Sequence, residues 1–200
     1  MTRILPLILL LTYSFAQEPR ANRPHSGSVF KDGKWSEKQN PMYAFELHRA
    51  KSAKSKYVVK TIPAVIYFDK MKWKVDSSKA AEGVVSFTPN GEKMTVVSVK
   101  VRKGYLSKEE IRKWLLEFYT TVYGKSQNKI VNLDYINGKE FNSYFFVNEY
   151  KGSHIIAYDM VHSDIQETLV ITTICPGTEH LRLYQPLMEF VSGIEANNSL

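Results

Sequence analysis

The chain has 200 residues, a single cysteine and a formal net charge of +7. One cysteine excludes an intramolecular disulfide, so a hydrophobic core must hold the fold together. About 180 residues remain after the N-terminal signal described below, which is enough for one domain with such a core. The charge is uneven, because residues 17–60 hold 10 basic and 4 acidic side chains whereas residues 61–200 hold 16 of each. The excess positive charge therefore belongs to the N-terminal segment.

Residues 1–16 have the pattern of a secretory signal peptide. Arg3 precedes an apolar run over residues 4–11, and Ser14 and Ala16 place small side chains where a signal peptidase cleaves. The run is shorter than the ~20 residues of a membrane-spanning helix. This favours cleavage after Ala16 over the alternative, a retained membrane anchor. We therefore expect an exported protein, periplasmic or secreted, with no transmembrane segment after cleavage.

Residues 17–56 form a basic segment that we expect to be largely flexible, ahead of a single domain over residues 57–196. Residues 17–41 are rich in Pro, Gly, Ser, Asn and charge, and they lack helical or strand periodicity. Residues 42–50 predict a short helix that packs on the domain.

Five cations lie close together where this segment meets the domain, with no acidic residue among them. They are Arg49, Lys51, Lys54, Lys56 and Lys60. Clustered cations attract phosphates, acidic lipid headgroups and acidic proteins in a salt-dependent way. These residues are candidates for contact with an anionic surface of the cell envelope or with an acidic protein, and a solvated lead-in to the domain is the alternative. Nucleic acid is disfavoured, because the chain is expected to be exported and no recognition fold for nucleic acid is evident.

The first half of the domain predicts strands followed by one helix. Apolar and β-branched residues mark four stretches: YVVKTIPAVIYF, MKWKV, GVVSF and MTVVSVKVR. The last two are separated by the turn Pro89-Asn90-Gly91 and predict a hairpin. Ser107 and Glu110 then form a capping box, and Gly124 ends the predicted helix. Its apolar side chains recur at helical spacing: Ile111, Leu115, Phe118 and Val122.

The second half predicts four strands and a final helix. The strands are KIVNLDYI, KEFNSYFFVNEY, SHIIAYDMVH and QETLVITTIC. In the middle two strands both sets of alternating side chains are apolar, so both faces of the sheet need cover. A helix from Thr178 to about residue 192 supplies the second cover, and Pro186 inside it should bend or split it. We therefore predict an α+β fold in which an antiparallel sheet of about seven to eight strands is sandwiched between helices.

This order of elements resembles the PsbP-like superfold, which includes the photosystem extrinsic subunit and exported bacterial proteins of the DcrB type. The stretches that carry the resemblance are IYFDKMKWKV, the helix after SKEE, INGKEFNSYFFVNEY and the final FVSGI, within residues 60–194. The resemblance implies a mostly non-enzymatic protein that binds other proteins or stabilises complexes. It provides no catalytic residue to carry over to this chain.

Motifs for catalysis or metal binding are not found. His154 and His162 share one predicted strand but are separated by about 26 Å, too far to bind one ion. Cys175 and His180 flank a strand-to-helix corner, and two ligands do not make a zinc site. The chain has no G-x-S-x-G elbow and no glycine-rich phosphate loop. We therefore predict no catalytic residue, no metal site and no cofactor, and we interpret Cys175 as a buried apolar thiol.

Together these features predict an exported, non-enzymatic binding or accessory protein of the cell envelope that acts through protein–protein contacts. The partner is not identified by the sequence. The alternative is a hydrolase or a small-ligand-binding protein with a pocket between a helix and the sheet.

Overall fold

The computed structural model describes residues 28–32, 34–37 and 45–197, and the expected signal peptide over residues 1–16 lies outside them. In this part of the chain, one sheet has ten strands in the order β2-β1-β3-β9-β10-β11-β12-β8-β7-β6. Its strands are β1 Ser28–Lys31, β2 Lys34–Glu37, β3 Phe45–Leu47, β6 Trp73–Asp76, β7 Val84–Pro89, β8 Val96–Lys103, β9 Lys125–Ile136, β10 Lys139–Tyr150, β11 Ser153–Ser163 and β12 Glu167–Pro176.

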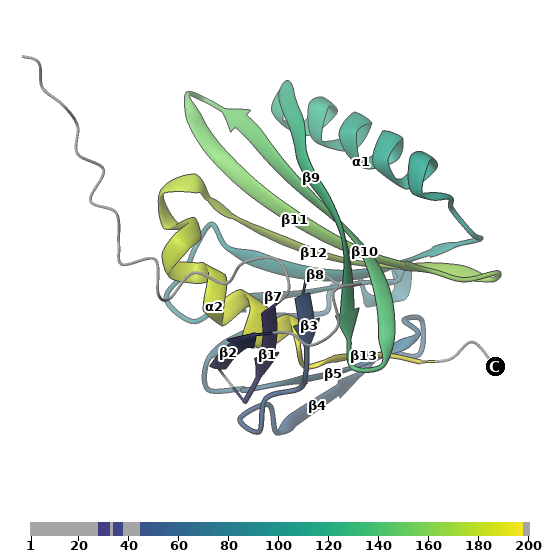
Figure 1. The fold of residues 1–200 in the computed structure, drawn as a ribbon, viewed down its shortest axis with the longest axis vertical. Coiled ribbons are helices and arrows are strands. Elements are labelled where there is room, and N and C mark those ends of the chain that lie inside the picture. Colours follow the sequence, from purple (N-terminus) through teal and green to yellow (C-terminus); the bar gives the residue numbers. More distant parts are fainter. Residues whose placement is uncertain (1–27, 33, 38–44, 198–200) are drawn as a thin grey trace, which may run out of the picture.

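A second, smaller sheet and two α-helices complete the described fold. The small sheet has the order β13-β5-β4, with β4 Ser55–Val58, β5 Ala64–Phe68 and β13 Ile194–Ala196. The α-helices are α1 Lys108–Tyr123 and α2 His180–Val191, and the 3-10 helices are η2 Ala80–Glu82 and η3 Gly177–Glu179. Figure 1 shows α1 and α2 on opposite sides of strands β9 to β12, with the small sheet on the α2 side.

The large sheet corrects the predicted one in size and in strand direction. It has ten described strands instead of seven to eight, and it is mixed, because β3 pairs in parallel with both β1 and β9. The additional strands β1, β2 and β3 come from the basic N-terminal segment that was expected to be flexible. The helix expected over residues 42–50 is wrong where it can be compared, because β3 is a strand; residues 42–44 lie outside the described part.

The helix α1 begins and ends as predicted. The Ser107 hydroxyl accepts the Glu110 amide, and the Glu110 carboxylate accepts the Ser107 amide at 2.8 Å, so the capping box is complete. The buried face differs from the expected stripe and consists of Ile111, Leu115 and Tyr119. Phe118 and Val122 are instead 40% and 48% exposed. The helix is therefore rotated toward Tyr119, whose hydroxyl has a buried partner in the sheet.

The two apolar faces predicted for the central strands are confirmed. Phe141 and Phe145 lie on the α2 side, where Tyr158 of β11 is opposite Phe145. Tyr144 and Phe146 lie on the other side, in the cluster beneath α1. Each face is covered by a helix, as the two-sided apolar pattern requires. The helix α2 is not split at Pro186 and begins at His180, after the 3-10 turn η3.

Asp134 on β9 binds the N-terminal segment to the large sheet. Its carboxylate is buried and accepts the backbone amide of Phe45 on β3 at 3.1 Å. The same carboxylate accepts the hydroxyls of Ser143 and Tyr158. A buried carboxylate is tolerated only when donors such as these satisfy it. The position of β3 therefore depends on a side chain far along the chain, at a sequence separation of 89.

Asn137, in the turn after β9, joins three segments through its side chain. Its Oδ1 accepts the Arg49 amide at 2.9 Å, and its Nδ2 donates to the carbonyls of Ser192 at 2.5 Å and Ile194 at 3.0 Å. Its backbone has a φ of 44°, a conformation that Asn tolerates better than most residues. The predicted Asn137-Gly138 turn is thus also the junction between the N-terminal segment, the large sheet and the small sheet.

Substitution Asn137→Gly should lower the free energy of unfolding by about 2 kcal/mol, because three hydrogen bonds worth roughly 1 kcal/mol each are lost and Gly relieves some backbone strain. The matched control is Lys151→Gly, at a turn position with a similar φ of 49°. This control removes no such junction and should leave stability unchanged or slightly raised. Urea unfolding of both variants is the measurement, and equal effects at the two turns would contradict the role of Asn137.

Candidate binding surface

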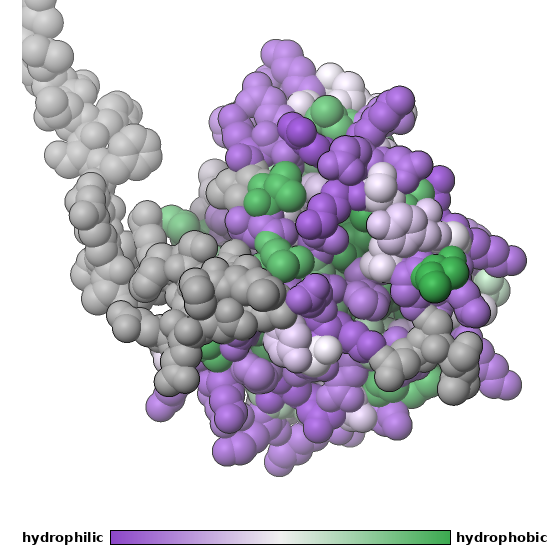
Figure 2. All heavy atoms as spheres, turned by 45° about the vertical axis from the view of Figure 1, so that its right-hand side comes forward, coloured by the Kyte–Doolittle hydropathy of each residue, from purple (hydrophilic) through white to green (hydrophobic). Residues whose placement is uncertain are grey.

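The candidate cations predicted from the sequence lie on, beside or at the end of the outward face of the small sheet. Strand alternation turns Tyr57, Ala64, Ile66 and Phe68 toward the core. The opposite face of the same strands then presents Lys56, Val58, Val65, Tyr67 and Glu195, with Lys56 directly opposite Tyr67 and Glu195 opposite Val65. We call this face, together with the loop over residues 49–54 beside it, the basic face. Figure 2 shows mainly hydrophilic side chains along the lower part of the molecule, where Figure 1 places the small sheet.

Arg49 is held in a defined position on the basic face. Its guanidinium lies 4.1 Å from the centroid of the Tyr67 ring and forms an ion pair with Glu195 at 2.9 Å. Its backbone amide is bound by Asn137. The cation is therefore oriented by an aromatic ring, a carboxylate and the backbone, and it remains partly exposed, with 41% of its side chain accessible.

Three of the five candidate cations line one shallow hollow. Arg49, Lys51 and Lys54 surround it together with Tyr67 and two alanines, Ala50 and Ala53. Lys51 forms an exposed ion pair with Asp32 at 3.3 Å. Exposed pairs of this kind contribute little stability, so Lys51 can exchange its partner at low cost.

Lys56 and Lys60 do not line the hollow. Lys56 lies on β4 beside Tyr67, and Lys60 follows the end of the same strand. No carboxylate of the described residues forms an ion pair with Lys54, Lys56 or Lys60, all of which are exposed. The structure thus brings four of the predicted residues onto or beside one face and leaves Lys60 at its end.

Tyr67 and Glu195 belong to the basic face and were missed in the sequence. The alternation in AVIYF, residues 64–68, could have placed Val65 and Tyr67 on the outward side. The contact of Tyr67 with Arg49 could not be found in this way, because Arg49 is held beside β5 by two residues distant in the sequence, Asn137 at its backbone amide and Glu195 at its guanidinium.

Cys175 and His180 are close together but are not arranged as a nucleophile and its base. The thiol Sγ lies 3.8 Å from His180 Nδ1. Burial raises the pKa of the Cys175 thiol to about 11 and lowers the pKa of His180. Both groups are therefore neutral near pH 7, whereas a nucleophilic cysteine requires a thiolate. The predicted burial of Cys175 is confirmed.

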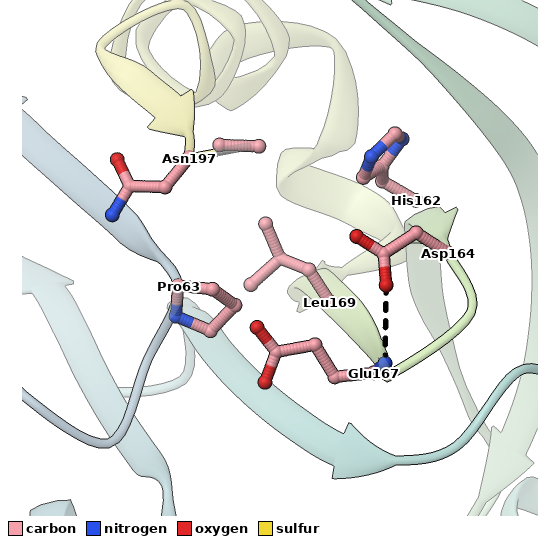
Figure 3. A pocket seen from close by; sticks show the side chains of 7 residues that line it. Pro63, His162, Asp164, Glu167, Leu169 and Asn197 are labelled. Carbon is pink, nitrogen blue, oxygen red and sulfur yellow. Dashed lines mark hydrogen bonds between the residues drawn. The ribbon is translucent and has the colours of Figure 1, made fainter. Parts of the chain in front are cut away.

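A second small hollow is lined by His162, Asp164 and Glu167 (Figure 3). The Asp164 carboxylate accepts the backbone amides of Gln166 and Glu167, at 3.0 and 3.2 Å, and so stabilises the turn between β11 and β12. The His162 ring bonds the Glu140 carbonyl through Nδ1 at 2.9 Å. These contacts give the His162 ring and the Asp164 carboxylate structural roles. Within the described ranges, no group of three or more His, Cys, Asp and Glu side chains is arranged to hold a metal ion.

A buried carboxyl group lies between α1 and the sheet. Asp159 is fully buried and accepts hydrogen bonds from the Tyr119 hydroxyl at 2.7 Å and from the Thr172 hydroxyl at 2.6 Å. Burial raises its pKa to about 6, although these hydrogen bonds and the charge of Lys100 oppose the shift. Burial also lowers the pKa of Lys100, whose ammonium lies over the rings of Trp114 and Phe118. At this point beneath α1, the space between the helix and the sheet is filled by side chains bonded to one another.

Comparison with solved structures gives a fold-level match. The solution structure of cyanobacterial PsbP (CyanoP) from Synechocystis sp. PCC 6803 has a TM-score of 0.52 and 12% identity, and the match covers 72% of this chain and 93% of that chain. A mutant of the protein Mog1 (TM-score 0.46, 10% identity, 72% and 96% covered) and a protein from Bacteroides thetaiotaomicron VPI-5482 (0.43, 11%, 74% and 50%) are also similar. No family model and no curated protein sequence matches the chain. The first likeness confirms that the fold is PsbP-like.

Asp159 should make the protein less stable as the pH rises. Its pKa is about 6 in the fold and 3.8 in the reference state, so the folded protein binds more protons between these values. The contribution of Asp159 to the free energy of unfolding is therefore fully present below about pH 3.8. It is lost as the pH rises through about 6, and the total loss is about 3 kcal/mol. Urea unfolding from about pH 3.5 to 7 should show this loss in the wild type relative to Asp159→Asn.

The control for this prediction is Asp76→Asn. Hydrogen bonds from Ser78 lower the pKa of the exposed Asp76 carboxyl, so its contribution has the opposite sign and disappears as the pH falls. If wild type and Asp159→Asn differ in stability by the same amount at all pH values, Asp159 does not titrate as inferred.

Proposed function

We propose that the protein is an exported, non-enzymatic binding or accessory protein of the cell envelope, and that the basic face is its contact surface for a protein partner. The observation that carries this proposal is the arrangement of Arg49, Lys54 and Lys56 around Tyr67. Arg49 is already oriented on the ring, and Lys54 and Lys56 are exposed without a carboxylate partner among the described residues. Arginine and tyrosine are residue types that are enriched in protein interfaces.

The kind of partner follows from the charges. An acidic protein surface would meet an Arg49 that Tyr67 and Glu195 already orient, and lysines whose backbone is held on or beside a sheet, so less conformational entropy is lost on binding than from a mobile chain. Opposite charge also raises the rate of encounter at low salt. The PsbP-like fold supports the same role, because the resemblance implies proteins that act mostly by binding.

The chemistry of the interior supports binding over catalysis. The Cys175 thiol has a raised pKa, the Asp159 carboxyl is buried under α1 with two hydroxyl partners, and Asp164 is bonded to its own turn. None of these three groups is placed as an activated nucleophile or an accessible general base.

Export is supported by the signal-like pattern of residues 1–16, and we propose a periplasmic or secreted location. In the described part of the chain, neither α-helix has the length and apolar character needed to cross a bilayer.

Affinity capture with cross-linking tests this function. The mature chain, residues 17–200, is used as bait in the envelope fraction of its own source. The wild type should retain a protein partner, and raising the salt concentration should weaken its retention. The triple variant Lys54→Glu/Lys56→Glu/Lys60→Glu should retain it about tenfold less, because three attractions become repulsions. The control variant Lys74→Glu/Lys93→Glu/Lys103→Glu changes the charge equally at exposed positions elsewhere and should retain it fully.

Retention of no specific protein, or equal retention by both triple variants, would contradict the proposed function. Turnover of ester, peptide or phosphate substrates by the wild type would favour the hydrolase alternative.

A further inference from the structure

The strand β4 has an open edge. It is the outermost strand in the small-sheet order β13-β5-β4 and pairs only with β5, over Ser55–Val58. No backbone group on its other side is bonded to another described residue. Figure 1 shows β4 at the outer end of the small sheet. An edge of this kind presents a row of N–H and C=O groups that another extended chain can pair with.

The opposite end of the small sheet is closed in a different way. The carbonyls of Ser192 and Ile194, before and at the start of β13, accept the side-chain amide of Asn137. That end is therefore joined to the large sheet, and β4 is the end of the small sheet that is open to an added strand.

The side chains of β4 determine which residues an added strand would need at its facing positions. Lys56 and Val58 point outward, and Val58 is 57% exposed. Tyr57 points inward and packs edge-on against Phe87, with ring centroids 5.9 Å apart. Side chains directly opposite each other on paired strands lie about 4.5–5.5 Å apart between Cβ atoms. An added strand would thus place one side chain beside Lys56 and its neighbour beside Tyr57.

The charge along this edge selects an acidic strand. Lys54, Lys56 and Lys60 are exposed and form no ion pair with the described residues. The nearby carboxylates are used by other cations, since Glu195 pairs with Arg49 and Asp32 pairs with Lys51. A carboxylate beside Lys56 therefore adds a cross-strand ion pair that the protein itself does not supply.

The same charge acts against a second copy of this chain. Two β4 edges that paired with each other would bring two sets of lysines together, and like charges on opposite strands are destabilising. At β6, at one end of the large sheet, Lys74 shares a strand face with Asp76. The positive charge is offset there, so the edge of β6 would attract an added acidic strand less than the edge of β4 does.

We propose that the edge of β4 binds an extended acidic segment of the protein partner as a fourth strand of the small sheet. The segment places a carboxylate beside Lys56 and an apolar side chain beside Tyr57. This inference rests on the proposed function, and it specifies the partner segment as a strand in which acidic and apolar residues alternate.

The test uses a short acetylated peptide that alternates Glu and Val, titrated into the full mature chain. Amide hydrogen exchange over residues 55–58 should slow when the peptide binds, because free N–H groups become paired. The variant Lys56→Glu should weaken binding about fivefold or more. The matched variant Lys74→Glu, also an exposed lysine on an outer strand, should leave binding unchanged, and urea unfolding confirms that both variants fold.

Two further probes separate strand addition from simple charge attraction. The same peptide with alternate amides N-methylated keeps its charge but cannot pair along one edge, and it should not bind. Equal binding of the methylated peptide, or unchanged exchange at residues 55–58, would overturn strand addition while leaving the proposed function intact. Vesicles containing phosphatidylglycerol should not slow exchange at these residues. If they do, the edge responds to a membrane surface and the proposal is wrong.

Discussion

The buried carboxylate of Asp134 is the interaction on which the rest of the arrangement depends. It accepts the Phe45 amide from β3, the Ser143 hydroxyl from β10 and the Tyr158 hydroxyl from β11. This makes the N-terminal strands part of the large sheet. Asn137, three residues further on, then fixes the Arg49 amide and the chain before β13. Two polar side chains, one on β9 and one in the turn after it, thereby position β3, the segment after it and the chain around the start of β13.

Because the basic stretch follows β3 directly, it is held as a surface and is not a free tail. Arg49 lies over Tyr67, and the lysines that follow lead into β4. The small sheet gains its inward face from the common core and presents its outward face and its β4 edge. The proposed acidic partner would meet cations presented on a folded surface, so that geometry and charge could act together in its recognition.

The parts of the fold that could be predicted from sequence are those governed by local signals. The capping box of α1 and the two apolar faces of β10 and β11 are encoded within a few residues of each other. The strand β3 was missed because its pairing with β9 is non-local. The strands β1 and β2 pair with each other close by in the sequence, and the Asp32-Gly33 dipeptide between them is a local hairpin signal that was missed. The Asn137-Gly138 turn was recognised, but the side-chain partners of Asn137 lie 88, 55 and 57 residues away. For the same reason the sequence identified the cations of the basic face and not Tyr67 or Glu195.

Amide hydrogen exchange of the wild-type protein, measured residue by residue, tests the docking of the N-terminal segment most directly. The amides of Phe45 and Arg49, which bond Asp134 and Asn137, should exchange as slowly as those of β9 and β10. Exchange of these two amides at the rate of an unstructured chain, while β9 and β10 remain protected, would contradict the account.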